Sequence, residues 1–358
     1  MPAHAPQPLG RQARNARLGR ARHAGPPLVL IAVIVALGAY RGAAMLAGPA
    51  RDRPWPLSAV SRSASVDVGV TTGPLGLNEW RAWQPRDLRT VNAFENVVHK
   101  HVSVVMWYAD WHQDPASHAQ LQAIARRGSL PEITWEPWDY SKGAYNRQPS
   151  YTLASIIGGS HDAYIRSWAR ALAAAGGPVR LRFAQEMNGN WYPWAEVTNG
   201  NRRGQFVNAW RHVHDLFRAA GATNVQWVWS PVALADSINT ELYPGDRYVD
   251  IIGLSLFNGG AQLKFNRWQS FAEKIGRPLA AERRISRRKP IEVSEVGVAE
   301  QGGSKARWIS GMFQTLNANP RIISLVWFDL HTASDWRVES SRSAEAAFAA
   351  AVSSPRYR

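Results

Sequence analysis

The 358-residue sequence contains no cysteine, which excludes disulfide bonds and thiolate metal sites. This absence leaves the compartment open, because exported proteins can also lack cysteine. Charged residues make up only 19% of the chain and hydrophobic residues 45%, so an intrinsically disordered protein is excluded. Length and composition predict a globular protein with a sizeable core, in one large domain or two ordinary ones.

Acidic side chains are scarce beside basic ones, and the formal net charge is +15. Residues 1–53 contribute +7 of this charge, and the stretch from Lys274 to Lys289 contributes +6. The rest of the chain is therefore nearly neutral. A nucleic-acid-binding domain would carry its positive charge along a binding face, so we expect no nucleic-acid partner.

The N-terminus has the pattern of an export signal. Several arginines precede an apolar run from Leu28 to Tyr40, and such a pattern is typical of a signal peptide or a signal anchor. We expect residues 1–25 to form a basic cytoplasmic segment, residues 26–48 a signal peptide or transmembrane anchor, and residues 49–65 a linker. The remainder would lie on the periplasmic or extracellular side, membrane-anchored or, after cleavage of the signal, secreted.

From residue 66 onward, short runs rich in β-branched residues alternate with segments of helical length. The predicted strands are 66–71, 102–107, 132–135, 179–184, 225–229, 250–255, 291–294 and 322–328, and the predicted helices are 87–100, 115–127, 161–175, 204–220, 266–281, 305–317 and 343–352. This alternation predicts βαβ units and a parallel sheet. Eight strands over roughly 290 residues fit an α/β protein with one (β/α)8 TIM barrel over residues 66–358.

A doubly wound sheet is the competing α/β fold. It would carry a glycine-rich phosphate loop after the first strand. The segment Thr72-Gly-Pro-Leu-Gly-Leu-Asn78 lacks the G-x-G-x-x-G spacing of such a loop, and this favours the barrel.

Tryptophan is abundant: the chain has 17, and 16 of them follow residue 79. One interpretation is core packing, and the other is that flat indole faces form stacking platforms for sugar rings. The pairs Trp135/Trp138 and Trp191/Trp194 stand beside acidic and amide residues near predicted strand ends, which favours sugar binding for part of the set.

Acidic and amide side chains collect where the predicted strands end. In a barrel these ends form one mouth, which holds the active site. The side chains are those of Asp110, Glu136, Asp139, Gln185, Glu186, Asn188, Asn258, Glu295 and Asp329. Two carboxyl groups among aromatic residues are what hydrolysis of a glycosidic bond requires.

Glu186 and Glu295 follow the fourth and seventh predicted strands, which lie nearly opposite each other across an eight-stranded ring. Their long side chains can therefore face each other over the mouth. A retaining mechanism places its two carboxyl groups roughly 5–5.5 Å apart, one as acid/base and one as nucleophile. This pair predicts a glycosidase.

Two segments resemble the catalytic motifs of glycoside hydrolase family 26. Leu181-Arg-Phe-Ala-Gln-Glu-Met-Asn-Gly-Asn-Trp-Tyr-Pro-Trp194 is similar to the acid/base motif, and Ser294-Glu-Val-Gly297 is similar to the nucleophile motif. The first match is highly specific, whereas the second would be weak alone. The family comprises β-mannanases and some β-glucanases and β-xylanases, and the resemblance runs from about residue 66 to residue 341.

The resemblance implies hydrolysis of internal β-glycosidic bonds in a polysaccharide, in the manner of mannan endo-1,4-β-mannosidase. It implies Glu186 as the acid/base and Glu295 as the nucleophile. The predicted substrate-binding residues are Gln185, Trp191, Trp194, Asn258, Trp327, Glu136 and Trp107. Arg182 is predicted to orient a carboxylate from behind, and a plain structural ion pair is the alternative. We expect no metal ion and no cofactor, and the oligomeric state stays open.

Two positions depart from the family pattern. Gln185 stands where the family usually has histidine, and Phe257 stands where the sixth strand often supplies a tyrosine that hydrogen-bonds the nucleophile. These departures keep open a non-catalytic polysaccharide-binding barrel. A β-glucanase acting in exopolysaccharide synthesis or export is another alternative, since an anchor would keep the enzyme beside its producer cell.

The basic stretch from Arg283 to Lys289 directly precedes the seventh predicted strand. It should therefore lie at the N-terminal face of the barrel, away from the mouth, and the linker should enter at that same face. Anionic lipid headgroups are one candidate partner for this stretch. A solvated loop is the alternative.

Overall fold

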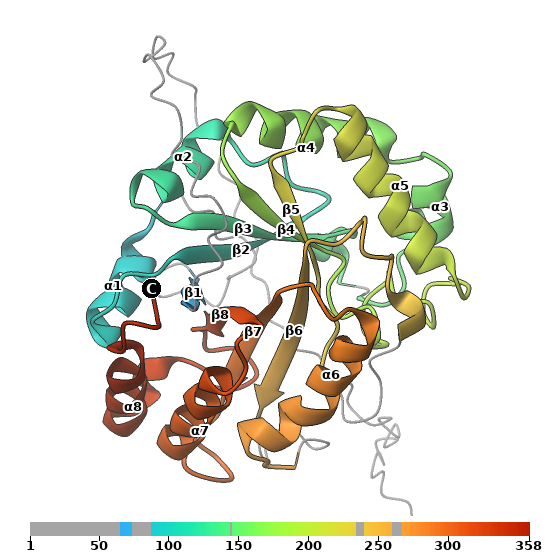
Figure 1. Cartoon of the computed structure of the whole chain (residues 1–358). Helices are drawn as coiled ribbons and strands as arrows, with labels where there is room; N and C mark the ends of the chain where they lie inside the picture. The colour runs from blue at the N-terminus through green and yellow to red at the C-terminus, as the bar shows by residue number, and fades with distance from the viewer. Residues whose placement is uncertain (1–64, 74–86, 144, 234–239, 260–266) are drawn as a thin grey trace, which may run out of the picture.

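Eight parallel strands form a closed barrel in the computed structural model, each strand pairing with the next and β8 with β1 (Figure 1). The structure describes residues 65–73, 87–143, 145–233, 240–259 and 267–358. The strands are β1 Asp67–Thr71, β2 Val104–Asp110, β3 Leu130–Glu136, β4 Val179–Phe183, β5 Val225–Trp229, β6 Ile251–Asn258, β7 Ile291–Val298 and β8 Ile322–Phe328. The predicted (β/α)8 TIM barrel is thereby confirmed.

Helices surround the barrel and join successive strands, except that the described part of the connection from β5 to β6 contains only a 3₁₀ turn (Figure 1). They are α1 Arg89–Val98, α2 His118–Arg126, α3 Leu153–Ile157, α4 Asp162–Ala175, α5 Gln205–Ala219, α6 Phe271–Ile285, α7 Lys305–Asn317 and α8 Arg342–Val352, with short 3₁₀ turns at Tyr140–Lys142, Pro149–Tyr151, Thr240–Leu242 and Val338–Ser340. Each strand therefore ends at one face of the barrel and begins at the other, which separates a mouth from a base.

Alternate residues of each strand face the barrel interior and the surrounding helices. On β2, Val105 and Trp107 belong to the main core, which the helices share, whereas Met106 and Tyr108 belong to a separate cluster with Phe257. This separate cluster fills one side of the interior with apolar and aromatic groups. Polar side chains occupy the other side.

A buried ion cluster closes the base of the interior. Arg180 on β4 donates to Glu292 at 2.7 Å and to Asp67 at 3.3 Å, and the Ser294 hydroxyl donates to Glu292 at 2.7 Å. Glu132 on β3 has no exposed surface and lies 4.0 Å from Arg180. Burial, and next the charge of Glu292, raises the pKa of Glu132 well above its usual range.

The end of α6 differs from the sequence prediction, which placed it at residue 281. The helix begins with a capping box at Ser270, contains Pro278 and runs to Ile285. Arg283 and Arg284 therefore lie in its last turn, where positive side chains are stabilised by the helix dipole.

The predicted segments 1–25 and 26–48, and nearly all of the linker 49–65, lie outside the described residues. Within the described ranges, no helix combines the length and the apolar character needed to cross a bilayer.

Glu132 makes the stability of the barrel depend on pH. Because its pKa is raised on folding, the folded protein holds a proton that the unfolded chain releases above about pH 4.3. The free energy of unfolding should therefore fall as the pH rises from there towards the folded-state pKa. In Glu132→Gln this fall should be smaller, as measured by urea unfolding between about pH 5 and pH 8.

Glu241→Gln is the matched control, since Glu241 is an exposed carboxylate paired with Arg203. It should leave the pH dependence as it is in the unmodified chain. An unchanged slope in Glu132→Gln would show that Glu132 is not the group that holds the proton.

Candidate active site

The chain leaves β4 through a strained backbone. Ala184 and Glu186 both have positive φ angles, of 47° and 54°, which residues with a side chain seldom adopt. The backbone N–H of Glu186 donates to the carbonyl of Ser230 at 2.8 Å, which ties this turn to the end of β5. Strained positions of this kind collect at functional sites, and here the strain places Glu186 at the mouth.

The Glu186 side chain is 4% exposed and accepts a hydrogen bond from the Trp191 indole N–H at 2.9 Å. Burial, and next the negative charge of Glu295, raises the pKa of Glu186 to about 7. The positive charge of Arg182 and the hydrogen bonds from Trp191 and Ser255 oppose this rise. Glu186 is thus poised to hold or release a proton near neutral pH.

Glu295 lies inside β7 and pairs with a buried cation. Its Oε2 atom lies 2.8 Å from Nη1 of Arg182, which has no exposed surface. The same guanidinium donates to the hydroxyls of Thr134, at 3.1 Å, and Ser255. Burial opposes the charge of Arg182, but Glu295 and further acidic neighbours raise its pKa above the ordinary range, so the cation is retained.

Ser255 connects the two carboxyl groups. Its hydroxyl accepts from Arg182, which pairs with Glu295, and it is also a hydrogen-bond partner of Glu186. Ser255 stands opposite Glu295 in the pairing of β6 with β7. Glu186 and Glu295, from opposite sides of the barrel, therefore belong to one polar network.

Tyr108 on β2 adds a hydroxyl to this network. The side chain is buried, and burial first, then the charge of Glu295 and a hydrogen bond to it, raises the pKa of Tyr108 well above its usual range. Phe257 cannot supply such a bond and packs on Phe328 and Trp336, with ring centroids 5.2 and 5.1 Å apart. Tyr108 on β2 thus supplies the hydroxyl that a tyrosine on the sixth strand would otherwise provide to Glu295.

Gln185 is buried and contacts Glu136 at the end of β3. Its side-chain amide donates to Glu136 Oε1 at 2.6 Å, and the Trp138 indole donates to Glu136 Oε2 at 3.3 Å. Trp194 has no exposed surface and donates to the Gln185 backbone carbonyl at 2.7 Å. Trp194 therefore supports Gln185 from behind, while the Gln185 side-chain oxygen has no protein partner.

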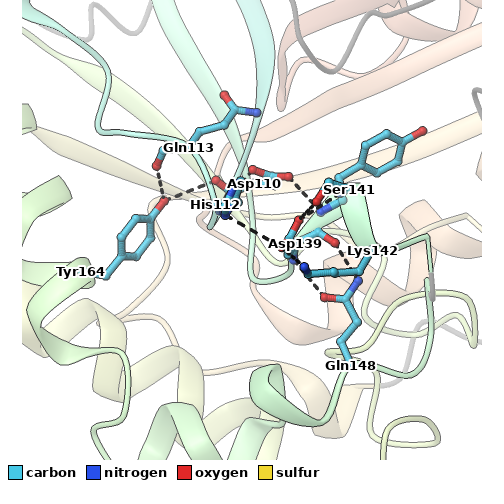
Figure 2. A network of polar contacts seen from close by, with 9 residues as sticks. Asp110, His112, Gln113, Asp139, Ser141, Lys142, Gln148 and Tyr164 are labelled. Atoms are coloured by element: carbon cyan, nitrogen blue, oxygen red, sulfur yellow. Dashed lines mark hydrogen bonds and ion pairs between the residues drawn. The ribbon is translucent and has the colours of Figure 1, made fainter. Parts of the chain in front are cut away.

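Asp110 organises the loop after β2, and Figure 2 shows it in a network of polar contacts. Its carboxylate accepts the backbone N–H groups of His112, at 3.2 Å, and Tyr140, at 2.9 Å. The Tyr164 hydroxyl donates to the backbone carbonyl of Gln113 at 2.8 Å. These bonds fix the loop to the chain after β3 and to α4.

Asp139 organises the loop after β3 in the same network (Figure 2). Its carboxylate accepts from the backbone N–H of Ser141 at 3.0 Å and from the Ser141 hydroxyl. The side-chain amide of Gln148 bonds both the N–H and the carbonyl of Asp139 at 2.9 Å. Asp110 and Asp139 thus serve as internal loop fasteners, with their oxygens engaged by the protein itself.

Three other predicted substrate contacts are buried against other parts of the chain. Trp107 is buried in the core that the helices share, and Trp327 packs on Phe348 of α8 with ring centroids 5.3 Å apart. Asn258 is buried, and its side-chain amide bonds the backbone of Gln269 at 3.0 and 3.3 Å. Successive side chains of a strand point to opposite faces, so the position of a tryptophan in its strand decides whether it faces the barrel interior or the helices. The number of tryptophans alone does not show which face each one takes.

Sequence reasoning missed Ser255, Thr134 and Tyr108. A signal existed for Thr134, because it lies two residues before Glu136 and so points to the same side of β3. Among the described residues, no group of three or more acidic or histidine side chains is arranged to hold a metal ion.

The comparisons with known proteins agree with this geometry. The sequence model of Glycosyl hydrolase family 26 matches residues 129–274, which confirms the resemblance indicated by the sequence motifs. The chain is 33% identical over 295 residues to Endoglucanase H of Acetivibrio thermocellus, a match that covers 80% of the chain and 31% of that protein. It is 31% identical over 161 residues to a mannan endo-1,4-β-mannosidase of Bacillus subtilis, covering 40% of the chain and 44% of that protein.

The chain therefore spans about a third of the length of Endoglucanase H and less than half of the mannosidase. Among solved structures, the catalytic domain of an endo-β-1,4-mannanase from Bacillus sp. JAMB-750 superposes with a TM-score of 0.64. That match is 17% identical and covers 82% of this chain and 87% of the other. At this identity it shows the shared fold.

The raised pKa of Glu186 can be measured directly. Carbon NMR of glutamate-labelled protein should show one side-chain carboxyl that titrates near pH 7 and is absent in Glu186→Gln. Glu295→Gln should lower the pKa of Glu186, because it removes the neighbouring negative charge and leaves Arg182 to favour the anion. Glu241→Gln, an exposed change, should leave this resonance as it is. If the pKa of Glu186 stayed the same in Glu295→Gln, the charge of Glu295 would not act on Glu186.

Proposed function

We propose that this chain, a member of Glycosyl hydrolase family 26, hydrolyses internal β-glycosidic bonds of a polysaccharide with retention of configuration. One observation carries the proposal: two buried carboxyl groups share a network but differ in their surroundings. Glu295 is paired with Arg182 at 2.8 Å, whereas Glu186 has a pKa raised to about 7. Retaining glycosidases need this difference, because one group attacks as an anion and the other donates a proton.

In the first step, the Glu295 carboxylate attacks the anomeric carbon while Glu186 donates its proton to the leaving glycosidic oxygen. The bond between that carbon and oxygen breaks, and a covalent glycosyl ester forms on Glu295. In the second step, Glu186 removes a proton from water, the water oxygen attacks the anomeric carbon, and Glu295 leaves as a carboxylate. At the end of the second step Glu186 carries a proton and Glu295 is a carboxylate again, as at the start.

The electrostatics of the site support this exchange of roles. The negative charge of Glu295 is the second largest cause that raises the pKa of Glu186. Ester formation abolishes that charge, so the pKa of Glu186 should fall once it has given up its proton. Glu186 then stays ionised and ready to accept a proton from water.

The substrate that we propose is a β-linked mannan, with Trp191 as a sugar platform. Trp191 is partly exposed and its indole donates to Glu186, so one side chain can contact a sugar and hold the acid in place. A β-glucanase is the second candidate, favoured by the match to Endoglucanase H over 80% of the chain.

We further propose that the barrel of residues 66–358 acts outside the cytoplasmic membrane. The support is the sequence of residues 1–48, in which arginines precede an apolar run. Such a segment would leave the barrel anchored to the outer surface of the membrane or, after cleavage, secreted.

Substitution of the two glutamates should have different effects on substrates whose leaving groups differ in their need for a proton. On β-mannan, mixed-linkage β-glucan and β-xylan, Glu186→Gln should lose on the order of 10²–10⁴-fold in kcat/KM, since the leaving oxygen is no longer protonated. On an aryl β-glycoside with an acidic phenol, Glu186→Gln should keep fast release of the phenol, because that leaving group needs no proton. Glu295→Gln should be inactive on every one of these substrates.

Azide supplies the control for stereochemistry. With the aryl substrate, azide should rescue Glu186→Ala to a β-glycosyl azide and Glu295→Ala to an α-glycosyl azide, products that proton NMR distinguishes. Binding of a polysaccharide without cleavage of any substrate by the unmodified chain would instead establish the non-catalytic barrel.

The Tyr108 hydroxyl should assist the nucleophile. Tyr108→Phe should lower kcat/KM by about 10- to 100-fold, since a hydrogen bond to a buried charged group is lost. Tyr243→Phe is the matched control, because Tyr243 donates to Asp246 at 2.6 Å on the chain between β5 and β6. Equal kcat/KM values in the two variants would remove Tyr108 from the catalytic network.

A further inference from the structure

The end of α6 and the loop before β7 carry a row of exposed positive side chains. Arg283, Arg284, Arg287 and Arg288 are exposed, and Lys289 is half-buried. Within the described ranges, none of the five forms an ion pair with a carboxylate. We call these five residues the basic face, and their charge is available to an external partner.

The basic face is held in a fixed shape. Arg321 donates from Nη2 to the carbonyl of Ser286 at 2.8 Å and from Nε to that of Lys289 at 3.1 Å. Arg283 donates to the side chain of Asn319, in the turn before β8. The loop is therefore tied at both ends, so Arg287 and Arg288 project from a preorganised support.

The basic face lies at the base of the barrel, opposite the mouth that holds Glu186. The loop precedes β7, so it joins the N-terminal ends of the strands. The described chain also begins at this end, where the N–H of Val66 donates to the carbonyl of Arg356 at 2.7 Å. Residues 1–64, which include the apolar run, are therefore joined to the barrel at the end where the basic face lies.

We propose that the basic face docks on a bilayer surface rich in anionic lipid headgroups, with the active-site mouth turned away from the membrane. Clustered arginines near a bilayer are attracted to acidic headgroups, and the attraction decays within a Debye length. An acidic polysaccharide substrate would have to reach the mouth, at the other end of the barrel. This inference rests on the proposed location outside the cytoplasmic membrane, in which a signal anchor at residues 26–48 would bring a bilayer to this end of the barrel.

The absence of cysteine allows a clean test with single labels on the full chain. Ser353→Cys places a label at the base, after α8, and Val197→Cys places one after β4, on a side chain that is 78% exposed. Each labelled chain is reconstituted into vesicles of phosphatidylcholine, with or without phosphatidylglycerol, that contain a quencher lipid. The base label should be quenched several-fold more with phosphatidylglycerol, and added salt should reverse the difference.

Charge reversal distinguishes the basic face from net charge. Replacing Arg283, Arg284, Arg287 and Arg288 by Glu should abolish the phosphatidylglycerol-dependent quenching of the base label. Reversing four exposed basic residues on the mouth side, Lys142, Arg147, Arg202 and Arg203, changes the net charge equally and should leave it intact. Thermal unfolding verifies that both variants fold.

Two outcomes would overturn the proposal. Equal quenching of the base label in neutral and anionic vesicles would mean that the tether alone sets the orientation. Quenching that survives reversal of the basic face would assign the contact to other residues. Glycosidase activity is measured separately on soluble substrates, so its loss or retention does not affect this result.

Discussion

The buried ion pair between Arg182 and Glu295 is the constraint on which the site depends. A guanidinium without exposed surface must be matched by acceptors, because an unpaired buried charge is strongly destabilising. Glu295, Thr134 and Ser255 meet this need from three different strands. Since Ser255 also contacts Glu186, satisfying one cation fixes both carboxyl groups at once.

Strand β4 carries two buried arginines, Arg180 and Arg182, that belong to different ion networks. Arg180 and Arg182 are two residues apart on β4 and therefore point into the same interior. The lower arginine meets a closed cluster at the base, where Glu132 has a raised pKa and contributes to packing. The upper arginine meets a cluster that opens at the mouth. The ion network at the base therefore has a structural role, whereas the one at the mouth can take part in catalysis.

Much of the barrel could be predicted from sequence, because β-branched runs and helix periodicity are local signals. The strands at 225–229 and 322–328 have the predicted bounds, whereas β2, β6 and β7 continue further and carry Tyr108, Asn258 and Glu295 inside or at the end of a strand. Glu186 and Glu295 stand in short motifs, so the sequence indicated the pair. Ser255 escaped because the register shifts between Gly253 and Ser255, which places it opposite Glu295. Such a shift arises from pairing between strands, and no local pattern reveals it.

The loops fastened by Asp110 and Asp139 have a consequence for how this protein can diversify. Asp110 accepts the backbone of Tyr140 across the gap between the β2 and β3 loops, so the two loops form one mechanical unit. Lengthening either loop would displace the other. Evolution of this wall should therefore proceed by paired insertions in the loops after β2 and β3.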